Sequence, residues 1–328
     1  MEIPGFVDLQ VNGFKGVDFS SEDLTEKSFI YACQELIKQG TIVFLPTIIT
    51  NSPKVFERNL RLMVSCIVDT ELHDHIPGFH IEGPFISPED GARGAHNKAW
   101  VRDPDLNFLE QLFHWSAKKI KILTIAAELV GADELCKKAT QLGITVSLGH
   151  HLANAEDIKK LAESGAKLLT HLGNGLPQMI HRHNNPLWEG ISNDELMATI
   201  ITDGHHIPPA LIKTIIRAKE TSKLIVVSDA SPIAGLPPGK YHTLGNEAIL
   251  EPSGLLINPK TGYLVGSSST MIDCLNYLWS LNLISYDQLI DLGFYNPLNL
   301  LKIDPVEIKS RIEPRVRWKN KFELINSI

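Results

Sequence analysis

Short apolar runs recur along the first 230 residues of the chain, and amphipathic stretches separate most of them. These stretches, such as 26–40, 52–69 and 154–166, carry apolar residues at helical spacing. The pattern predicts a strand and a helix in alternation, repeated eight times. The apolar runs lie at 5–11, 41–47, 76–82, 120–126, 144–150, 166–172, 197–202 and 223–229.

The runs are continuous rather than alternating between apolar and polar residues. Continuous runs are typical of parallel strands that are covered on both faces. Eight strand-helix units in about 230 residues match the size of a closed barrel. A doubly wound open sheet is the main alternative, but no glycine-rich nucleotide fingerprint follows the first run. We therefore predict an α/β fold of the (β/α)8 TIM type that forms one domain over residues 1–328.

The segment 239–270 differs from the rest of the chain. Glycine, proline and asparagine turns separate short possible strands there, which predicts a small hairpin insertion near 240–265. From residue 271 onward the pattern predicts a short helical tail of two or three helices with a polar end. No linker or low-complexity tract marks a second domain.

Composition narrows the function classes. The chain has 43% hydrophobic and 21% charged residues, as soluble globular proteins do. Its net charge of −7 and the absence of a basic run argue against nucleic acid as a partner. The start of the chain has no basic leader and no apolar segment reaches about 18 residues, so we expect neither export nor membrane spanning. Four widely spaced cysteines predict no disulfide framework and fit a cytoplasmic location.

In such a barrel the active site lies at the carboxyl ends of the strands. Two imidazoles and one carboxylate form a common catalytic site for a divalent metal, whose bound water loses a proton near neutral pH. Asp229 could take that proton and pass it to a leaving group. The polar residues at strand ends are Gln10, Asn12, Glu82, His150, His171 and Asp229, of which Glu82, His150 and His171 are the candidate ligands.

Each of these residues also has a structural interpretation. Carboxylates at strand ends often cap loops, and a single loop histidine is more often a hydrogen-bonded structural residue than a ligand. The occurrence of four such residues at separate strand ends favours the functional interpretation. Glu82 is typical, because the Gly83-Pro84 pair cannot continue the strand that presents it.

At these residues the sequence resembles the N-acetylglucosamine-6-phosphate deacetylase family of the amidohydrolase superfamily. The resemblance implies that metal-bound water removes the acetyl group from N-acetylglucosamine 6-phosphate or a closely related N-acetyl amino sugar. The matching stretches follow the family order and are residues 4–13, 80–97, 147–158, 170–182, 202–209, 226–241 and 264–271.

The superfamily usually opens with a His-x-His pair on the first strand, where this chain has Gln10 and Asn12. The resemblance therefore implies a vestigial metal position there and one divalent ion on the other three ligands. An amide oxygen is a weaker ligand than an imidazole, which agrees with this interpretation. We expect zinc, with iron, manganese or cobalt as alternatives.

The resemblance also implies individual roles. Asp229 would be general base and then acid, and His96 would polarise the carbonyl as the oxyanion forms. In relatives the phosphate-binding arginine comes from a neighbouring subunit, so a homodimer is implied. The residues that would bind substrate and its phosphate are Ala95, Asn174, the backbone of Gly175, Arg182 and His206.

Three features depart from the family. The small β-sandwich of relatives is expected to be absent or much reduced. Gly173, Gly175 and Trp188 change the loop that would hold the substrate, and His151 stands where the family often has serine or threonine. A different N-acyl or cyclic amide therefore stays open as the substrate. A non-catalytic metal-binding barrel is a further alternative, which Asp229 argues against because a structural metal prefers a closed ligand shell.

Overall fold

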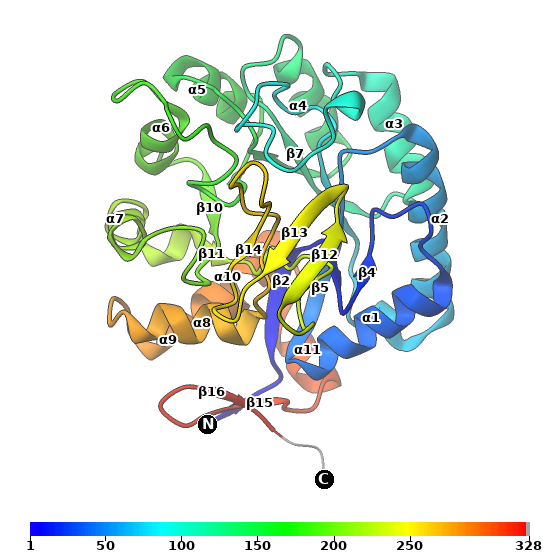
Figure 1. Cartoon of the computed structure of the whole chain (residues 1–328), viewed down its shortest axis with the longest axis vertical. Coiled ribbons are helices and arrows are strands. Elements are labelled where there is room, and N and C mark those ends of the chain that lie inside the picture. Colours follow the sequence, from blue (N-terminus) through cyan, green and yellow to red (C-terminus); the bar gives the residue numbers. More distant parts are fainter. Residues whose placement is uncertain (326–328) are drawn as a thin grey trace.

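Eight parallel strands form a nearly closed barrel in the computed structural model, which describes residues 1–325 (Figure 1). Seven of the eight predicted runs contain one of these strands and the run 41–47 lies within β5, so the predicted barrel is confirmed. The strands pair in the order of the chain. They are β2 (Phe6–Val11), β5 (Thr41–Ile49), β6 (Phe79–Glu82), β7 (Ile120–Ile125), β8 (Thr145–Leu148), β9 (Leu168–Leu169), β10 (Met197–Ile200) and β11 (Leu224–Val226).

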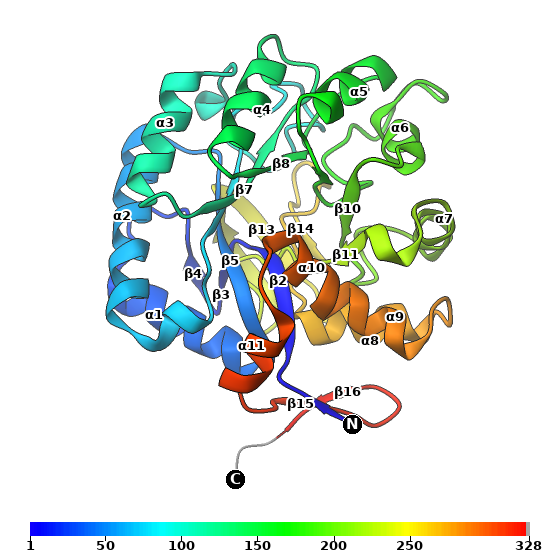
Figure 2. The same cartoon turned by 180° about the vertical axis from the view of Figure 1, so that it is seen from behind.

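A ring of helices covers the outside of the barrel (Figures 1 and 2). Their amphipathic faces bury against the strands, and side chains such as Thr25 and Ser52 cap their first turns. No helix among the described residues is long and apolar enough to cross a membrane. The helices between strands are α1 (Glu26–Lys38), α2 (Pro53–Asp69), α3 (Leu106–Trp115), α4 (Ala132–Gln141), α5 (Ala155–Glu163), α6 (Pro186–Ser192) and α7 (Pro209–Lys219).

The barrel closes between its first and last strands through isolated bridges rather than a full ladder. Val11 pairs with Ala230, and Ala230 pairs with Ser267. The main-chain N–H of Asn12 also donates to the carbonyl of Ala230 at 2.8 Å. The ends of the first and eighth strands are therefore held together at the level where the candidate site begins.

The insertion forms a three-stranded antiparallel sheet of β12 (Gly239–Thr243), β13 (Asn246–Leu250) and β14 (Leu256–Ile257). This sheet lies across the barrel in the view of Figure 1. Leu244 and Tyr263, from its turns, line the cavity at the candidate site. The insertion therefore forms part of the wall around the site.

The end of the chain differs from the predicted tail. Four helices are present: α8 (Met271–Ser280), α9 (Tyr286–Ile290), α10 (Asn296–Leu301) and α11 (Pro305–Arg311), with one π-helical turn, Asp291–Tyr295, before α10. A hairpin of β15 (Val316–Trp318) and β16 (Phe322–Leu324) follows, and β15 pairs with β1 (Glu2–Ile3). The two strands were missed because each is only three residues long and the sheet is completed by residues about 310 positions earlier in the chain.

Candidate active site

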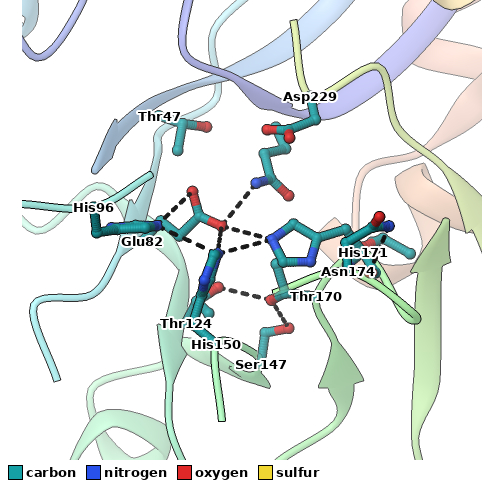
Figure 3. A network of polar contacts seen from close by, with 12 residues as sticks. Thr47, Glu82, His96, Thr124, Ser147, His150, Thr170, His171, Asn174 and Asp229 are labelled. Atoms are coloured by element: carbon teal, nitrogen blue, oxygen red, sulfur yellow. Dashed lines mark hydrogen bonds and ion pairs between the residues drawn. The ribbon is translucent and has the colours of Figure 1, made fainter. Parts of the chain in front are cut away.

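Three of the predicted ligands converge above the carboxyl ends of β6, β8 and β9 (Figure 3). Oε1 of Glu82 lies 3.1 Å from Nε2 of His150 and 3.0 Å from Nε2 of His171. The two Nε2 atoms are 3.0 Å apart. All three side chains are buried. The sequence interpretation placed these three residues together, and the structure confirms that placement.

The hydrogen-bond pattern fits a cation among these three atoms. Nδ1 of His150 lies 2.8 Å from the carbonyl oxygen of Ala92, which can only accept, so Nδ1 carries the hydrogen and the neutral ring turns its Nε2 lone pair inward. That lone pair faces a carboxylate oxygen and a second imidazole nitrogen. In a tetrahedral zinc site with bonds of 2.0–2.1 Å the ligand atoms would lie about 3.3 Å apart. Glu82, His150 and His171 are thus the residues that could hold a divalent metal.

Charge interactions in the cluster are strong. Burial alone would raise the pKa of Glu82, but the close imidazoles of His150 and His171 hold that pKa well below its usual range. Burial opposes the charged form of His150, yet the carboxylate of Glu82 raises the pKa of that imidazole. The carboxylate therefore stays ionised and available as a ligand.

Polar side chains support the cluster from below. The hydroxyl of Thr170 lies 2.8 Å from that of Thr124 and 2.5 Å from that of Ser147 (Figure 3). Nε2 of His80 also lies 2.8 Å from the hydroxyl of Thr124. This buried network links β6, β7, β8 and the residue after β9, and it fixes the strand ends from which the ligands project.

The backbone is unusual at three site residues. His150, His171 and Asp229 have φ values of 52°, 33° and 50°, in the left-handed region that residues with a Cβ rarely adopt. Gly83, directly after Glu82, has a φ of 84°, and a Cβ there would lie 2.2 Å from the hydroxyl oxygen of Thr50. Such conformations cost energy and cluster at functional sites, so they support the functional interpretation of these strand ends.

Asp229 lies in the same cavity as the cluster. Burial raises its pKa to about 6, and the charge of Glu82 acts in the same direction. The amide of Asn12 donates to Oδ1 of Asp229 at 2.8 Å, and the amide of Gln10 donates to Oε1 of Glu82 at 2.9 Å. A carboxyl group with a pKa near neutrality can both accept and return a proton.

His96 reaches the cluster from the loop that follows β6. Its Nδ1 accepts from the main-chain N–H of Thr50 at 3.3 Å, and burial lowers its pKa to about 3. The ring is therefore neutral, with its hydrogen on Nε2, which lies 3.3 Å from Nε2 of His150. His96 can thus present an N–H donor to an oxygen atom beside the cluster.

A cavity of about 200 Å³ surrounds these groups, and it adjoins an outer groove of about 600 Å³ beside the loop 90–98. Gly94 and Tyr263 line both spaces and therefore lie at the boundary between the groove and the cavity. The predicted substrate residues that line the cavity are Ala95, Asn174, Gly175 and His206.

Arg182 does not line the cavity. Its side chain is exposed, and its main-chain oxygen accepts from the indole N–H of Trp188 at 3.0 Å. Trp188 is also exposed, at 47%, and does not line the cavity. His151 is buried and does not line it either. Within one chain the structure thus separates Arg182 from the other candidate substrate residues.

The sequence interpretation did not identify two residues of the site, Asp203 and Thr50. Asp203 accepts from Nδ1 of His206 at 2.7 Å and fixes that ring beside the cavity. Thr50 holds His96 through the opposite arrangement: its main-chain N–H donates to Nδ1 of His96 at 3.3 Å, and its hydroxyl oxygen lies 2.9 Å from the same nitrogen. Both follow predicted strands, 197–202 and 41–47, so the rule that selected Glu82 and Asp229 could have found them.

Comparison with known proteins identifies relatives over most of the chain, although no family model matches. The N-acetylglucosamine-6-phosphate deacetylase of Homo sapiens is 33% identical over 318 residues, which cover 92% of this chain and 74% of the relative. The N-acetylgalactosamine-6-phosphate deacetylase of Escherichia coli O157:H7 is 26% identical and covers 92% of this chain and 78% of its own. The crystal structure of N-acetylglucosamine-6-phosphate deacetylase from Pasteurella multocida superposes with a TM-score of 0.82 at 26% identity, covering 92% of this chain and 76% of that one.

Proposed function

Because the chain belongs to the N-acetylglucosamine-6-phosphate deacetylase family, we propose that it hydrolyses the amide bond of an N-acetylated hexosamine 6-phosphate. The products would be acetate and the free amine. One observation carries the proposal: Glu82, His150 and His171 form a metal-ligand set in the same cavity as Asp229. A structural metal in a non-catalytic barrel would prefer a closed shell of four ligands. An open metal position beside a buried carboxyl group with a pKa of about 6 instead favours catalysis.

In the proposed reaction a divalent ion held by the three ligands would act as a Lewis acid, lowering the pKa of water and polarising the acetyl carbonyl. Asp229 accepts a proton as the water oxygen attacks the carbonyl carbon. Nε2–H of His96 donates to the oxyanion that develops. Asp229 then returns the proton to the amide nitrogen, and the carbon-nitrogen bond breaks. The net change consumes one water molecule.

We propose that Asn174, the main chain at Gly175 and His206 bind the phosphorylated sugar, with Ala95 contributing to the cavity wall. Arg182 would act on a neighbouring copy of the chain in a homodimer, where its planar fork could bind phosphate through two hydrogen bonds. Its exposed position, away from the cavity of its own chain, supports that arrangement.

Zinc is the metal we propose, since a carboxylate and two imidazoles suit it well. Iron, manganese and cobalt are alternatives, because each would tolerate a carboxylate and two imidazoles as ligands. A cytoplasmic location is part of the proposal, because the four cysteines are all free and buried. Elemental analysis of the isolated protein would identify the bound metal. Light scattering during size-exclusion chromatography would separately test the dimer.

The identity of the sugar is the least constrained part of the proposal. One relative acts, by its name, on the galactosamine epimer. Another N-acyl or cyclic amide is a further candidate, because Gly173 and Gly175 loosen the loop beside the cavity.

The decisive experiment is acetate release by the zinc-loaded protein. N-acetylglucosamine 6-phosphate, its galactosamine epimer and the unphosphorylated sugar would be compared, with a chelated sample alongside. We expect chelator-sensitive release that needs the phosphate. The control is Asp229→Asn, which should keep its metal and lose turnover. Parent-like turnover by that variant would refute the mechanism, and no release from any substrate would refute the function.

A further inference from the structure

Two amide side chains at the carboxyl end of the first barrel strand each donate to one of the two site carboxylates. Gln10 lies within β2 and Asn12 directly follows it, and the contacts of both amides place them in the candidate site. Gln10 donates to the candidate metal ligand Glu82, and Asn12 donates to Asp229. Both amides are almost completely buried. The pair thus contacts the carboxylates in the place where the superfamily has two histidines.

The orientation of the Asn12 amide follows from its partner. An ionised carboxylate can only accept hydrogen bonds, so the nitrogen of the amide must face Asp229. The reverse orientation would place two acceptor oxygens 2.8 Å apart. The main chain reinforces the contact, because the N–H of Asn12 donates to the carbonyl of Ala230, next to Asp229. The main-chain bond that closes the barrel therefore also holds the amide of Asn12 next to the carboxylate of Asp229.

The contact leaves the two oxygens of Asp229 in different states. Oδ1 accepts a hydrogen bond from Asn12. Oδ2 has no hydrogen-bond partner within residues 1–325, and it is not completely shielded from solvent. Resting on the proposed function, we infer that Asn12 is a positioning residue: it fixes Asp229 through Oδ1 and leaves Oδ2 as the atom that carries the proton.

A purely structural role explains Asn12 poorly. Its own Oδ1 is buried and has no partner in the described part of the chain. A buried amide with one end unsatisfied costs free energy, and a leucine of similar size would avoid that cost. The amide is explained if its donor is needed by Asp229, since a carboxylate free to rotate would present neither oxygen reliably.

The test compares Asn12→Leu and Asn12→Asp with the parent, all loaded with zinc. We expect unchanged metal content, a KM within about twofold, and a kcat lower by about 10- to 100-fold, the range for one hydrogen bond to a charged group. Because the hydrogen bond from Asn12 lowers the pKa of Asp229, the acidic limb of the kcat profile should move to higher pH. Asn12→Asp should show both effects more strongly, since it adds a second carboxylate.

Gln10→Leu is the matched control, two residues earlier in the chain. It removes the equivalent donor from Glu82, so it should weaken zinc affinity and leave the acidic limb of kcat in place at saturating zinc. The inference would be overturned if Asn12→Leu retained the parent kcat and pH profile. A loss of zinc from Asn12→Leu as large as that from Gln10→Leu would equally overturn it.

A second readout separates this inference from the proposed function. The carboxyl carbon of Asp229 can be followed by NMR in zinc-loaded parent and Asn12→Leu, with Asp229→Asn providing the assignment. The midpoint should rise in the variant whether or not any sugar is hydrolysed. Equal midpoints in two folded proteins would reject the positioning role, while an inactive parent with a shifted midpoint would reject only the proposed substrate.

Discussion

The substitution Asp203→Asn tests how much the fold depends on a carboxylate that accepts four hydrogen bonds beside the cavity. Each carboxylate oxygen of Asp203 accepts two hydrogen bonds. Oδ1 accepts from the main-chain N–H groups of His205 and His206 at 2.9 and 3.0 Å. Oδ2 accepts from Nδ1 of His206 at 2.7 Å and from the hydroxyl of Ser267 at 3.0 Å. Burial opposes the charge, yet the hydrogen bond from His206 holds the pKa of Asp203 well below its usual range.

Asparagine keeps the shape of the side chain and removes its charge. A hydrogen bond to a charged acceptor contributes about 1 kcal/mol more than one to a neutral acceptor. With two such bonds at each oxygen, we expect Asp203→Asn to lower the free energy of unfolding by about 2–4 kcal/mol. The new amide would also donate to Nδ1 of His206 and reverse its tautomer. We therefore expect a higher KM for phosphorylated substrate as well.

Urea unfolding of the parent and the variant measures the predicted difference. The folded pKa of Asp203 lies below the unfolded value of 3.8, so the stability it contributes is present above pH 3.8 and is lost as pH falls through the folded pKa. The difference between the proteins should be constant from pH 5 to 8 and shrink below about pH 4. A variant as stable as the parent at pH 7, or a gap that widens on acidification, would refute this reasoning.

Three further substitutions have defined outcomes. Burial raises the pKa of Asp8 from 3.8 to about 7, so between these pH values the folded state holds a proton that the unfolded state releases, and the parent loses stability as pH rises from 4 to 7. Urea unfolding should therefore show Asp8→Asn to be more stable than the parent at pH 8 by up to roughly 4 kcal/mol, and no more stable at pH 4. Gly175→Ala would place a methyl group 3.0 Å from Nδ1 of His150, so calorimetry should show weaker zinc binding, whereas Gly143→Ala, with a similar positive φ and open space, should bind zinc normally. Glu82→Gln should lower zinc affinity by more than about 100-fold and keep the parent circular dichroism spectrum, while global unfolding would favour a capping role.

The pattern of residues was sufficient to predict the barrel and the convergence of the three residues that could hold a metal. Each strand is a buried apolar run, and a polar residue such as Glu82 or Asp229 at the end of such a run stands out in the sequence. The barrel rule then brings these ends to one face although they are separated by more than a hundred residues. The fold and the convergence of these strand ends could thus be inferred without knowledge of any contact.

Other features depend on contacts that the pattern does not contain. The pairing of β1 with β15 joins segments near opposite ends of the chain, and neither is long enough to show a period. The positive φ angles at His150 and His171 are imposed by tertiary packing on residues whose own preference is different. Likewise, no sequence rule assigns the amide of Asn12 to Asp229, since 217 residues separate them.

The three buried carboxylates at the mouth of the barrel differ mainly in the partners that the fold supplies. Glu82 faces two imidazoles, and Asp203 faces one imidazole and two main-chain N–H groups, so the pKa of each is lowered. Among residues 1–325, Asp229 accepts a hydrogen bond only from the neutral amide of Asn12, and burial raises its pKa to about 6. Environments that push pKa values apart assign acid-base roles. The carboxylate with the weakest partner is thus the one suited to exchange a proton, and the other two are suited to bind and to orient.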